Sequence, residues 1–167
     1  MTFLVKDQHV DASGDTWYKV LLPIRPNGSM GWVRSQDVDV AGLRYSLVVR
    51  LRSFRLDLLY DGRLQATYPI GVGAENTPTP SGDYYIKELL RPPDQNTIYG
   101  HYVFGLSGFS NVLLNWPQGG VLGIHGTNDV GSIGRRVSHG CIRTPNVVID
   151  HLARILPLGT PVRVEDA

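Results

Sequence analysis

The chain has 167 residues, which is enough for one ordinary domain with its own hydrophobic core, or for a domain with a small addition. Hydrophobic residues make up 42% and charged residues 19%, a globular composition that argues against disorder. The formal net charge is +1 and the basic residues are dispersed, so we expect no nucleic-acid partner. No apolar run approaches the roughly 20 residues that a membrane-spanning helix needs.

Residues 1–42 are predicted to form a small β module. Residues 17–22 and 31–34 are strand-like, and Pro26-Asn-Gly-Ser between them is a strong turn signal. The stretch 17–33 (WYKVLLPIRPNGSMGWV) resembles the later part of a bacterial SH3-like module. About 40 residues are too few for an independent barrel. We therefore expect a partial module that leans on the rest of the chain, or else the first hairpin of a single domain.

Residues 43–167 are predicted to form a second, larger domain. Apolar-rich strands at 45–51 and 54–60 are followed by Asp61-Gly62, which is a hairpin turn into a strand at 63–72. Residues 77–82 (TPTPSG) form a rigid turn, and residues 91–96 form an exposed loop. Further strands are expected at 84–90, 102–106, 112–116, 121–125 and 161–165.

One helix is predicted near the C-terminus. Thr144 suits the N-cap and Pro145 the first helical position. Apolar residues then recur at helical spacing, at Val148, Leu152, Ile155 and Leu156. Pro157 and Gly159 end the helix. The pattern as a whole predicts a mainly β protein with one notable helix.

The only cysteine, Cys141, lies in a stretch with the features of a nucleophile site. A thiol nucleophile needs a base, donors for the oxyanion and open access for a carbonyl. Cys141 shortly precedes the predicted helix, whose positive end favours a thiolate, and Gly140 leaves the approach open with nearby amides as oxyanion donors. His125 ends an apolar strand and is the preferred base, because His139 points away from Cys141 if that segment is extended.

Two other interpretations of these residues stay open. A histidine is more often a hydrogen-bonded structural residue than a catalyst. His125, His139 and Cys141 also form a ligand set that suits zinc, although no clear fourth ligand accompanies them. We expect no metal and no cofactor.

Residues 45–165 resemble the L,D-transpeptidase catalytic domain, also called the YkuD domain. Four segments carry the resemblance: PIGVGAENTPTPSGDYYI at 69–86, FGLSGFS at 104–110, GIHGTND at 123–129 and VSHGCIR at 137–143. The resemblance implies a twisted β-sandwich with one main helix after the catalytic cysteine and an active site under a loop. Twelve residues separate His125 from Ser138, a spacing similar to that of the compact branch of the family with SHGCIR.

The resemblance also implies roles for individual residues. Cys141 is expected to be the nucleophile and His125 the proton acceptor and donor, oriented by a backbone carbonyl near Gly126. Ser138, His139 and Gly140 are expected to shape the oxyanion site, and Arg143 to lie beside the substrate.

The implied activity is peptidoglycan cross-linking, and hence cell-wall biogenesis and cell shape. Cys141 attacks the third residue of a stem tetrapeptide, D-Ala leaves, and the amine of a second stem resolves the thioester to give a 3→3 cross-link. Carbapenems are expected to acylate Cys141. Hydrolysis of the same thioester, as in an L,D-carboxypeptidase, is one alternative, and a non-catalytic wall-binding protein is another.

The substrate implies a location outside the cytoplasmic membrane, in the cell wall or periplasm. The first residues, MTFLVKD, lack the zones of a signal peptide. We therefore expect that Met1 begins a shortened chain whose precursor carries an export signal.

Overall fold

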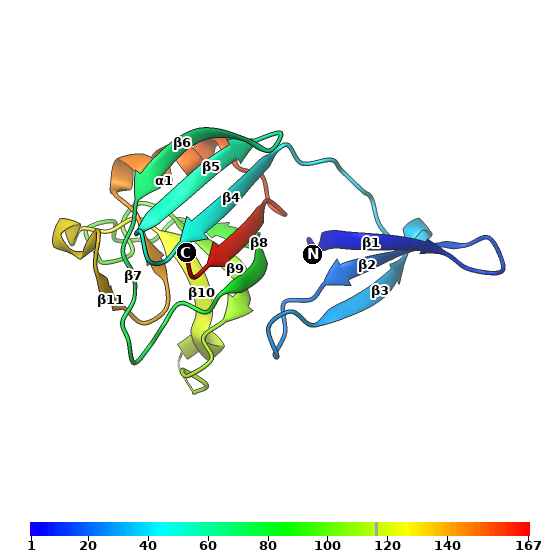
Figure 1. Cartoon of the computed structure of the whole chain (residues 1–167), viewed down its shortest axis with the longest axis horizontal. Helices are drawn as coiled ribbons and strands as arrows, with labels where there is room; N and C mark the ends of the chain where they lie inside the picture. The colour runs from blue at the N-terminus through cyan, green and yellow to red at the C-terminus, as the bar shows by residue number, and fades with distance from the viewer. Residues whose placement is uncertain (116) are drawn as a thin grey trace.

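The chain folds into two lobes of unequal size, which Figure 1 shows side by side. The computed structural model describes residues 1–115 and 117–167. A small sheet holds the N-terminal strands, and an extended connection through residues 38–44 leads to the larger lobe. Within the described residues no helix is long and apolar enough to cross a membrane.

The small lobe is a three-stranded antiparallel sheet in the order β1-β2-β3. Its strands are β1 (Leu4–Val10), β2 (Thr16–Leu21) and β3 (Met30–Arg34), and a 3-10 turn, η1 (Ser35–Asp37), follows. β2 and β3 confirm the two predicted strands. β1 was not predicted, since six of its seven residues are exposed and pairing with β2, not burial, defines it. The likeness of this lobe to an SH3 module stays a prediction.

The larger lobe is built on an eight-stranded sheet in the order β12-β10-β9-β8-β13-β4-β5-β6. The strands are β4 (Tyr45–Arg50), β5 (Arg55–Tyr60), β6 (Arg63–Pro69), β8 (Gly82–Leu90), β9 (Val103–Phe109), β10 (Val121–His125), β12 (Ile142–Arg143) and β13 (Pro161–Glu165). β7 (Val72–Gly73) and β11 (Arg136–Ser138) form a two-stranded parallel sheet beside it. The expected mainly β architecture with one main helix is confirmed.

The hairpin between β5 and β6 confirms the turn predicted at Asp61-Gly62. Both residues have positive φ, 49° at Asp61 and 75° at Gly62. Two successive positive φ angles match the right-handed twist of the flanking strands, and Asp-Gly adopts them at low cost.

The helix α1 (Asn146–Ile155) begins slightly later than predicted. Pro145 is the N-cap residue, and Thr144 makes no capping hydrogen bond. The Thr144 hydroxyl instead donates to the carbonyl of His125 at 3.2 Å. The predicted capping role of Thr144 is therefore wrong, because its hydroxyl links the helix entry to β10. The predicted end of the helix before Pro157 is confirmed.

One predicted strand is wrong, and besides β1 the short strands β11 and β12 were missed. The strand predicted at 63–72 is divided into β6, which ends at Pro69, and β7, which begins at Val72. Val112–Asn115 form bends and turns, and Trp116, the last residue of the predicted strand, lies outside the described residues. β11 and β12 are only three and two residues long, too short for an alternating pattern to reveal. β12 nevertheless contributes the edge of the large sheet.

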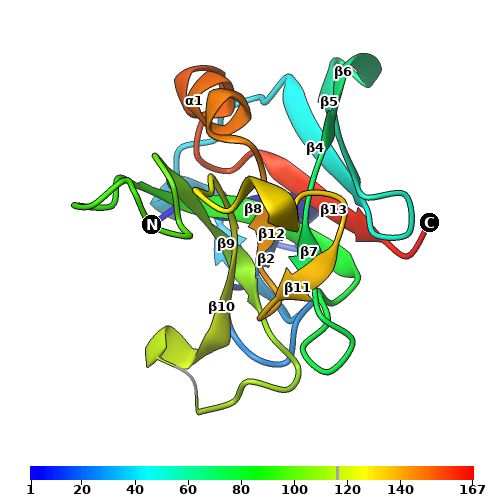
Figure 2. The same cartoon turned by 90° about the vertical axis from the view of Figure 1, so that its left-hand side faces the viewer.

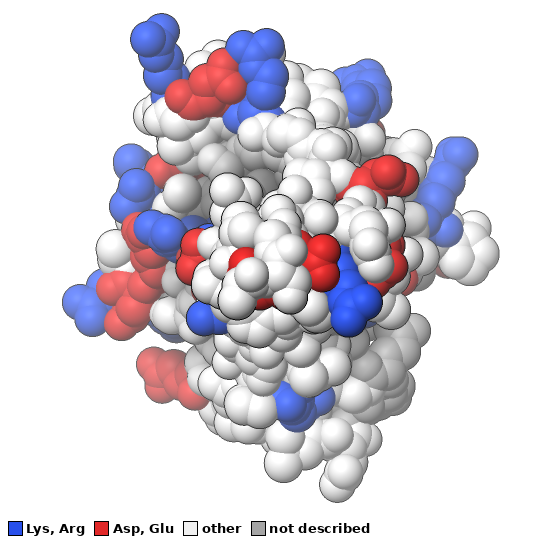
Figure 3. Space-filling view, turned by 90° about the vertical axis from the view of Figure 1, so that its right-hand side faces the viewer, with Lys and Arg blue, Asp and Glu red and all other residues white. Residues whose placement is uncertain are grey.

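The core lies between the curved sheet and α1, which packs over the sheet in Figure 2. The helix buries Val148, Ile149 and Leu152 against the cluster that includes Ile124 of β10 and Ile142 of β12. Charges of both signs are interspersed over the face that carries the small lobe (Figure 3). The apolar side chains of the sheet, not surface charge, therefore fix the positions of β10 and β12.

Shortening one buried and one exposed leucine side chain tests which face of each strand contributes to the free energy of unfolding. Leu56 on β5 is fully buried, whereas Leu64 on β6 is 61% exposed. We expect Leu56→Ala to lower the free energy of unfolding by about 3–5 kcal/mol, because it removes buried methyl groups and leaves a cavity. Leu64→Ala, the matched control, should change it by less than about 0.5 kcal/mol. Equal effects in urea denaturation would contradict the assigned faces.

Candidate active site

The site rests on the parallel pairing of β10 with β12. Ile124 pairs with Ile142 and His125 with Arg143. Ile124 and Ile142 are both fully buried in the core. Since side chains alternate between the two faces of a strand, Cys141, Arg143 and His125 all project from the opposite face.

Gly123 leaves room for the sulfur on this face. It lies one residue before Ile124, and Cys141 lies one residue before Ile142, the partner of Ile124. A methyl group at Gly123 would lie 3.8 Å from the Cys141 Sγ. The Gly123 backbone also hydrogen-bonds to the thiol, which holds the sulfur over the strand. Cys141 therefore directly precedes β12 and lies two residues before Arg143, the pairing partner of His125.

The His125 ring is held in one tautomer. Its Nδ1 lies 2.6 Å from the carbonyl oxygen of Gly126. A carbonyl only accepts, so Nδ1 carries the proton and Nε2 keeps a lone pair. The Tyr99 ring packs against the imidazole at a centroid distance of 5.2 Å. The expected orientation of His125 by the backbone at Gly126 agrees with this geometry.

The resting pair is neutral. Burial, together with the nearby charge of Arg143, lowers the pKa of His125 to about 4, against the opposing hydrogen bond to Gly126. Burial raises the pKa of the Cys141 thiol above its ordinary value. The helix-end effect that was predicted to favour a thiolate is outweighed by burial, and α1 begins only at Asn146.

A network of hydroxyls fixes the segment before the cysteine. The Ser138 Oγ accepts from the Gly140 amide at 3.1 Å and donates to the Cys141 carbonyl at 2.6 Å. The Thr79 hydroxyl donates to the Gly140 carbonyl at 2.8 Å, and the Thr77 hydroxyl to the Ser138 carbonyl at 2.8 Å. The rigid TPTPSG turn thus braces the segment that carries Cys141.

This network refines the expected oxyanion site. The Gly140 amide is taken by Ser138, so it is not the free donor that the sequence suggested. Gly140 has a φ of 109°, a left-handed conformation that strains other residues. Ser138 is buried, His139 is exposed and Cys141 is partly buried.

Arg143 is a buried cation on the reactive face. It is 8% exposed, and its Nη1 donates to Asp129 Oδ2 at 3.3 Å. Its Nε is buried without a hydrogen-bond partner among the described residues. A buried guanidinium with an unused donor is suited to an anionic group of a ligand.

Sequence reasoning missed several residues around the site. It predicted a rigid turn at TPTPSG and gave Thr77 and Thr79 no role, and only the folded chain brings them to residues 138–140. It left His101 without a role, and the structure pairs its Nδ1 with Asp150 of α1 at 2.9 Å. No group of three potential metal ligands occurs among residues 1–115 and 117–167.

The family model of the L,D-transpeptidase catalytic domain, YkuD, matches residues 44–164. A Bacillus subtilis protein named for this activity, YkuD, is 35% identical over 150 residues, covering 86% of this chain and 84% of the relative. A solved L,D-transpeptidase of Enterococcus faecium, a cysteine-to-serine mutant, is 25% identical with a TM-score of 0.57. That match covers 74% of this chain, which spans half the length of the E. faecium chain.

A third similar structure is the L,D-transpeptidase LdtMt1 in complex with imipenem. It is 16% identical with a TM-score of 0.58, and the match covers 98% of this chain and 81% of that one. At this identity the likeness concerns the fold. The family match and the B. subtilis relative identify the chain as a member of the L,D-transpeptidase family.

The neutral pair predicts how Cys141 alkylation depends on pH. Iodoacetamide reacts with the thiolate, so its rate follows the ionised fraction. Because burial raises the pKa above the ordinary 9.0, the rate should keep rising through pH 9. Mass spectrometry of the alkylated protein measures it, with Cys141→Ala as the unreactive control. A plateau below pH 8 would reveal a preformed thiolate and contradict the neutral pair.

The brace from Thr79 predicts a second effect. Thr79→Val removes the hydroxyl that joins the Gly73 amide to the Gly140 carbonyl, both buried. We expect it to cost about 1–3 kcal/mol of stability and to slow acylation of Cys141. Thr67→Val is the matched control, because the Thr67 hydroxyl bonds Asp57 on β5. Equal acylation rates in the two variants would refute a brace specific to the site.

Proposed function

We propose that this protein is a peptidoglycan L,D-transpeptidase that forms 3→3 cross-links through a thioester on Cys141, with release of D-Ala. One observation carries the proposal: His125, with Nδ1–H bound to the Gly126 carbonyl, pairs in register with Arg143 of β12, and Cys141 lies two residues before Arg143. A thiol beside an oriented neutral imidazole is the arrangement that acyl transfer requires. Family membership supports the same chemistry.

Acylation begins with proton transfer from the Cys141 thiol to the His125 Nε2. The thiolate attacks the carbonyl of the third stem residue, and the oxyanion takes the negative charge. The Cys141 amide is the proposed donor to that oxyanion, because Ser138 occupies the amide of Gly140. The His125 imidazolium then protonates the departing amine of D-Ala, and the thioester remains.

Deacylation reverses the proton flow. His125, now neutral, takes a proton from the side-chain amine of a second stem, and this amine attacks the thioester carbonyl. The new amide bond forms as the sulfur leaves, and the imidazolium returns its proton to the sulfur. Water in place of the amine gives the competing hydrolysis. Both courses need the same His125 and Cys141.

Arg143 supplies the positive charge for the donor peptide. Its guanidinium is buried near Cys141 and its Nε has no partner among the described residues. Stem peptides carry free carboxylates, and arginine binds carboxylates in a fixed geometry. We propose that Arg143 lies against such a carboxylate, and that the protein acts outside the cytoplasmic membrane, where peptidoglycan is cross-linked.

Stem-peptide turnover tests the proposed function. With a tetrapeptide stem and an amine acceptor, mass spectrometry should detect the cross-linked dimer and free D-Ala. Imipenem should add one adduct to the protein, as its complex with LdtMt1 suggests. Cys141→Ala should give no cross-linked dimer, no free D-Ala and no imipenem adduct. Formation of the tripeptide alone, with acceptor in excess, would favour the L,D-carboxypeptidase alternative.

If the protein forms no cross-linked dimer, no tripeptide and no imipenem adduct, the wall-binding alternative is favoured. The protein must be folded and its thiol reduced for this outcome to count. Sedimentation with purified peptidoglycan would then measure the binding that such a protein requires.

A further inference from the structure

The turn between β2 and β3 of the small lobe reaches across to the end of β9. The Asn27 Nδ2 donates to the Phe109 carbonyl at 2.7 Å, and the Phe109 amide donates to the Asn27 Oδ1 at 2.9 Å. Arg25 donates to the Ser110 carbonyl at 3.0 Å, and its guanidinium lies 4.6 Å from the centroid of the Phe109 ring. We call Arg25 and Asn27 the clamp.

The clamp acts where β9 loses its strand neighbour. β8 pairs with β9 from Val103 to Leu106, and the pairing ends there. On the other edge, Phe109 still pairs with Val121 of β10. The side-chain amide of Asn27 therefore supplies both hydrogen bonds that a neighbouring strand would give Phe109. A backbone donor and acceptor that are satisfied together hold the strand end in one position.

Ser110, the residue after Phe109, lies against the catalytic segment. Ser110 is 1% exposed, and its amide donates to the Gly120 carbonyl at 2.7 Å. A methyl group added at Gly140, which has no side chain, would lie 4.0 Å from the Ser110 Cβ, so Ser110 and Gly140 are neighbours with room for about one methyl group between them. Gly140 directly precedes Cys141. The clamp is thus joined to the nucleophile through Phe109, Ser110 and Gly140.

We propose that the small lobe is part of the acyl-transfer apparatus, and that Arg25 and Asn27 are positioning residues that hold Ser110 against Gly140 and so fix Cys141 for attack. This inference rests on the proposed function. It assigns the N-terminal lobe a role in catalysis, whether or not the lobe also binds the wall. Small displacements of a nucleophile are costly, because a shift of about 1 Å lowers rates roughly a hundredfold.

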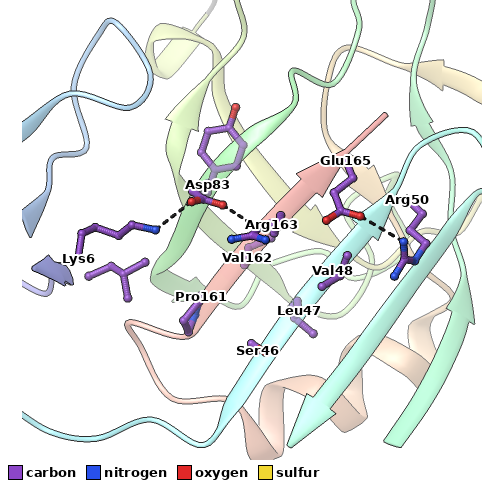
Figure 4. Close-up of a pocket in the computed structure, with 12 residues that line it drawn as sticks. Lys6, Ser46, Leu47, Val48, Arg50, Asp83, Pro161, Val162, Arg163 and Glu165 are labelled. Atoms are coloured by element: carbon purple, nitrogen blue, oxygen red, sulfur yellow. Dashed lines mark hydrogen bonds and ion pairs between the residues drawn. The ribbon is translucent and has the colours of Figure 1, made fainter. Parts of the chain in front are cut away.

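A second contact between the lobes provides the matched control. The Lys6 ammonium of β1 donates to Asp83 of β8 at 2.9 Å, in a pocket of about 250 Å³ that also holds Arg163 (Figure 4). This ion pair joins the lobes without touching β9. Lys6→Met and Arg25→Met each remove one cation from the contact between lobes, so they separate loss of docking from loss of positioning.

The experiment uses the full chain with Arg25→Met, Asn27→Ala and Lys6→Met beside the wild type. Acylation of Cys141 by a stem tetrapeptide should slow about tenfold in both clamp variants and stay unchanged in Lys6→Met. Alkylation of Cys141 by iodoacetamide should stay unchanged in all, because it needs no oxyanion site. Hydrogen–deuterium exchange should rise in peptides that cover 107–110 and 138–142 in the clamp variants alone.

Two results would overturn the proposal. One is acylation at the wild-type rate in both clamp variants. The other is an equal loss of the acylation rate in Lys6→Met, which would show that the clamp only docks the small lobe onto the larger one. If wild-type protein forms no thioester, the proposed function fails instead, and the exchange measurement still decides whether the clamp fixes residues 138–142. Unchanged hydrogen–deuterium exchange of residues 138–142 in the clamp variants would refute the role of the clamp, whatever the activity.

Discussion

The parallel pairing of β10 with β12 is the constraint on which the site depends. It places His125 opposite Arg143, which lies two residues after Cys141. Ile124 directly precedes His125, Ile142 lies between Cys141 and Arg143, and both isoleucines are buried in the core. A shift of one residue in this register would turn the reactive side chains into the core. Packing of two isoleucines therefore holds the catalytic geometry.

The hydrogen bonds around the site do two separate tasks. The Gly126 carbonyl sets the tautomer of His125, so that one neutral nitrogen is left to take a proton. The hydroxyls of Ser138 and Thr79 hold the backbone on either side of Gly140. Because burial raises the pKa of the Cys141 thiol, the proposed mechanism has to supply the energy to ionise it, through proton transfer to His125 and stabilisation of the oxyanion.

The sequence predicted the parts of this fold that have local signatures. The strands of the large sheet other than β12, the Asp61-Gly62 hairpin and the choice of His125 and Cys141 as candidates all follow from local patterns or the family resemblance. Contacts between distant segments could not be predicted in this way. The hydroxyl of Thr79 meets Gly140 across 61 residues, and Asn27 meets Phe109 across 82. A polar side chain gives no local sign of such a partner.

The tautomer and charge of His125 test the account most directly. Nitrogen-15 NMR of the histidine-labelled protein at pH 7, assigned with His125→Gln, distinguishes the three forms of the ring. We predict a neutral imidazole protonated on Nδ1, because the Gly126 carbonyl accepts that proton and burial lowers the pKa to about 4. A ring protonated on Nε2, or an imidazolium paired with a thiolate, would contradict the account.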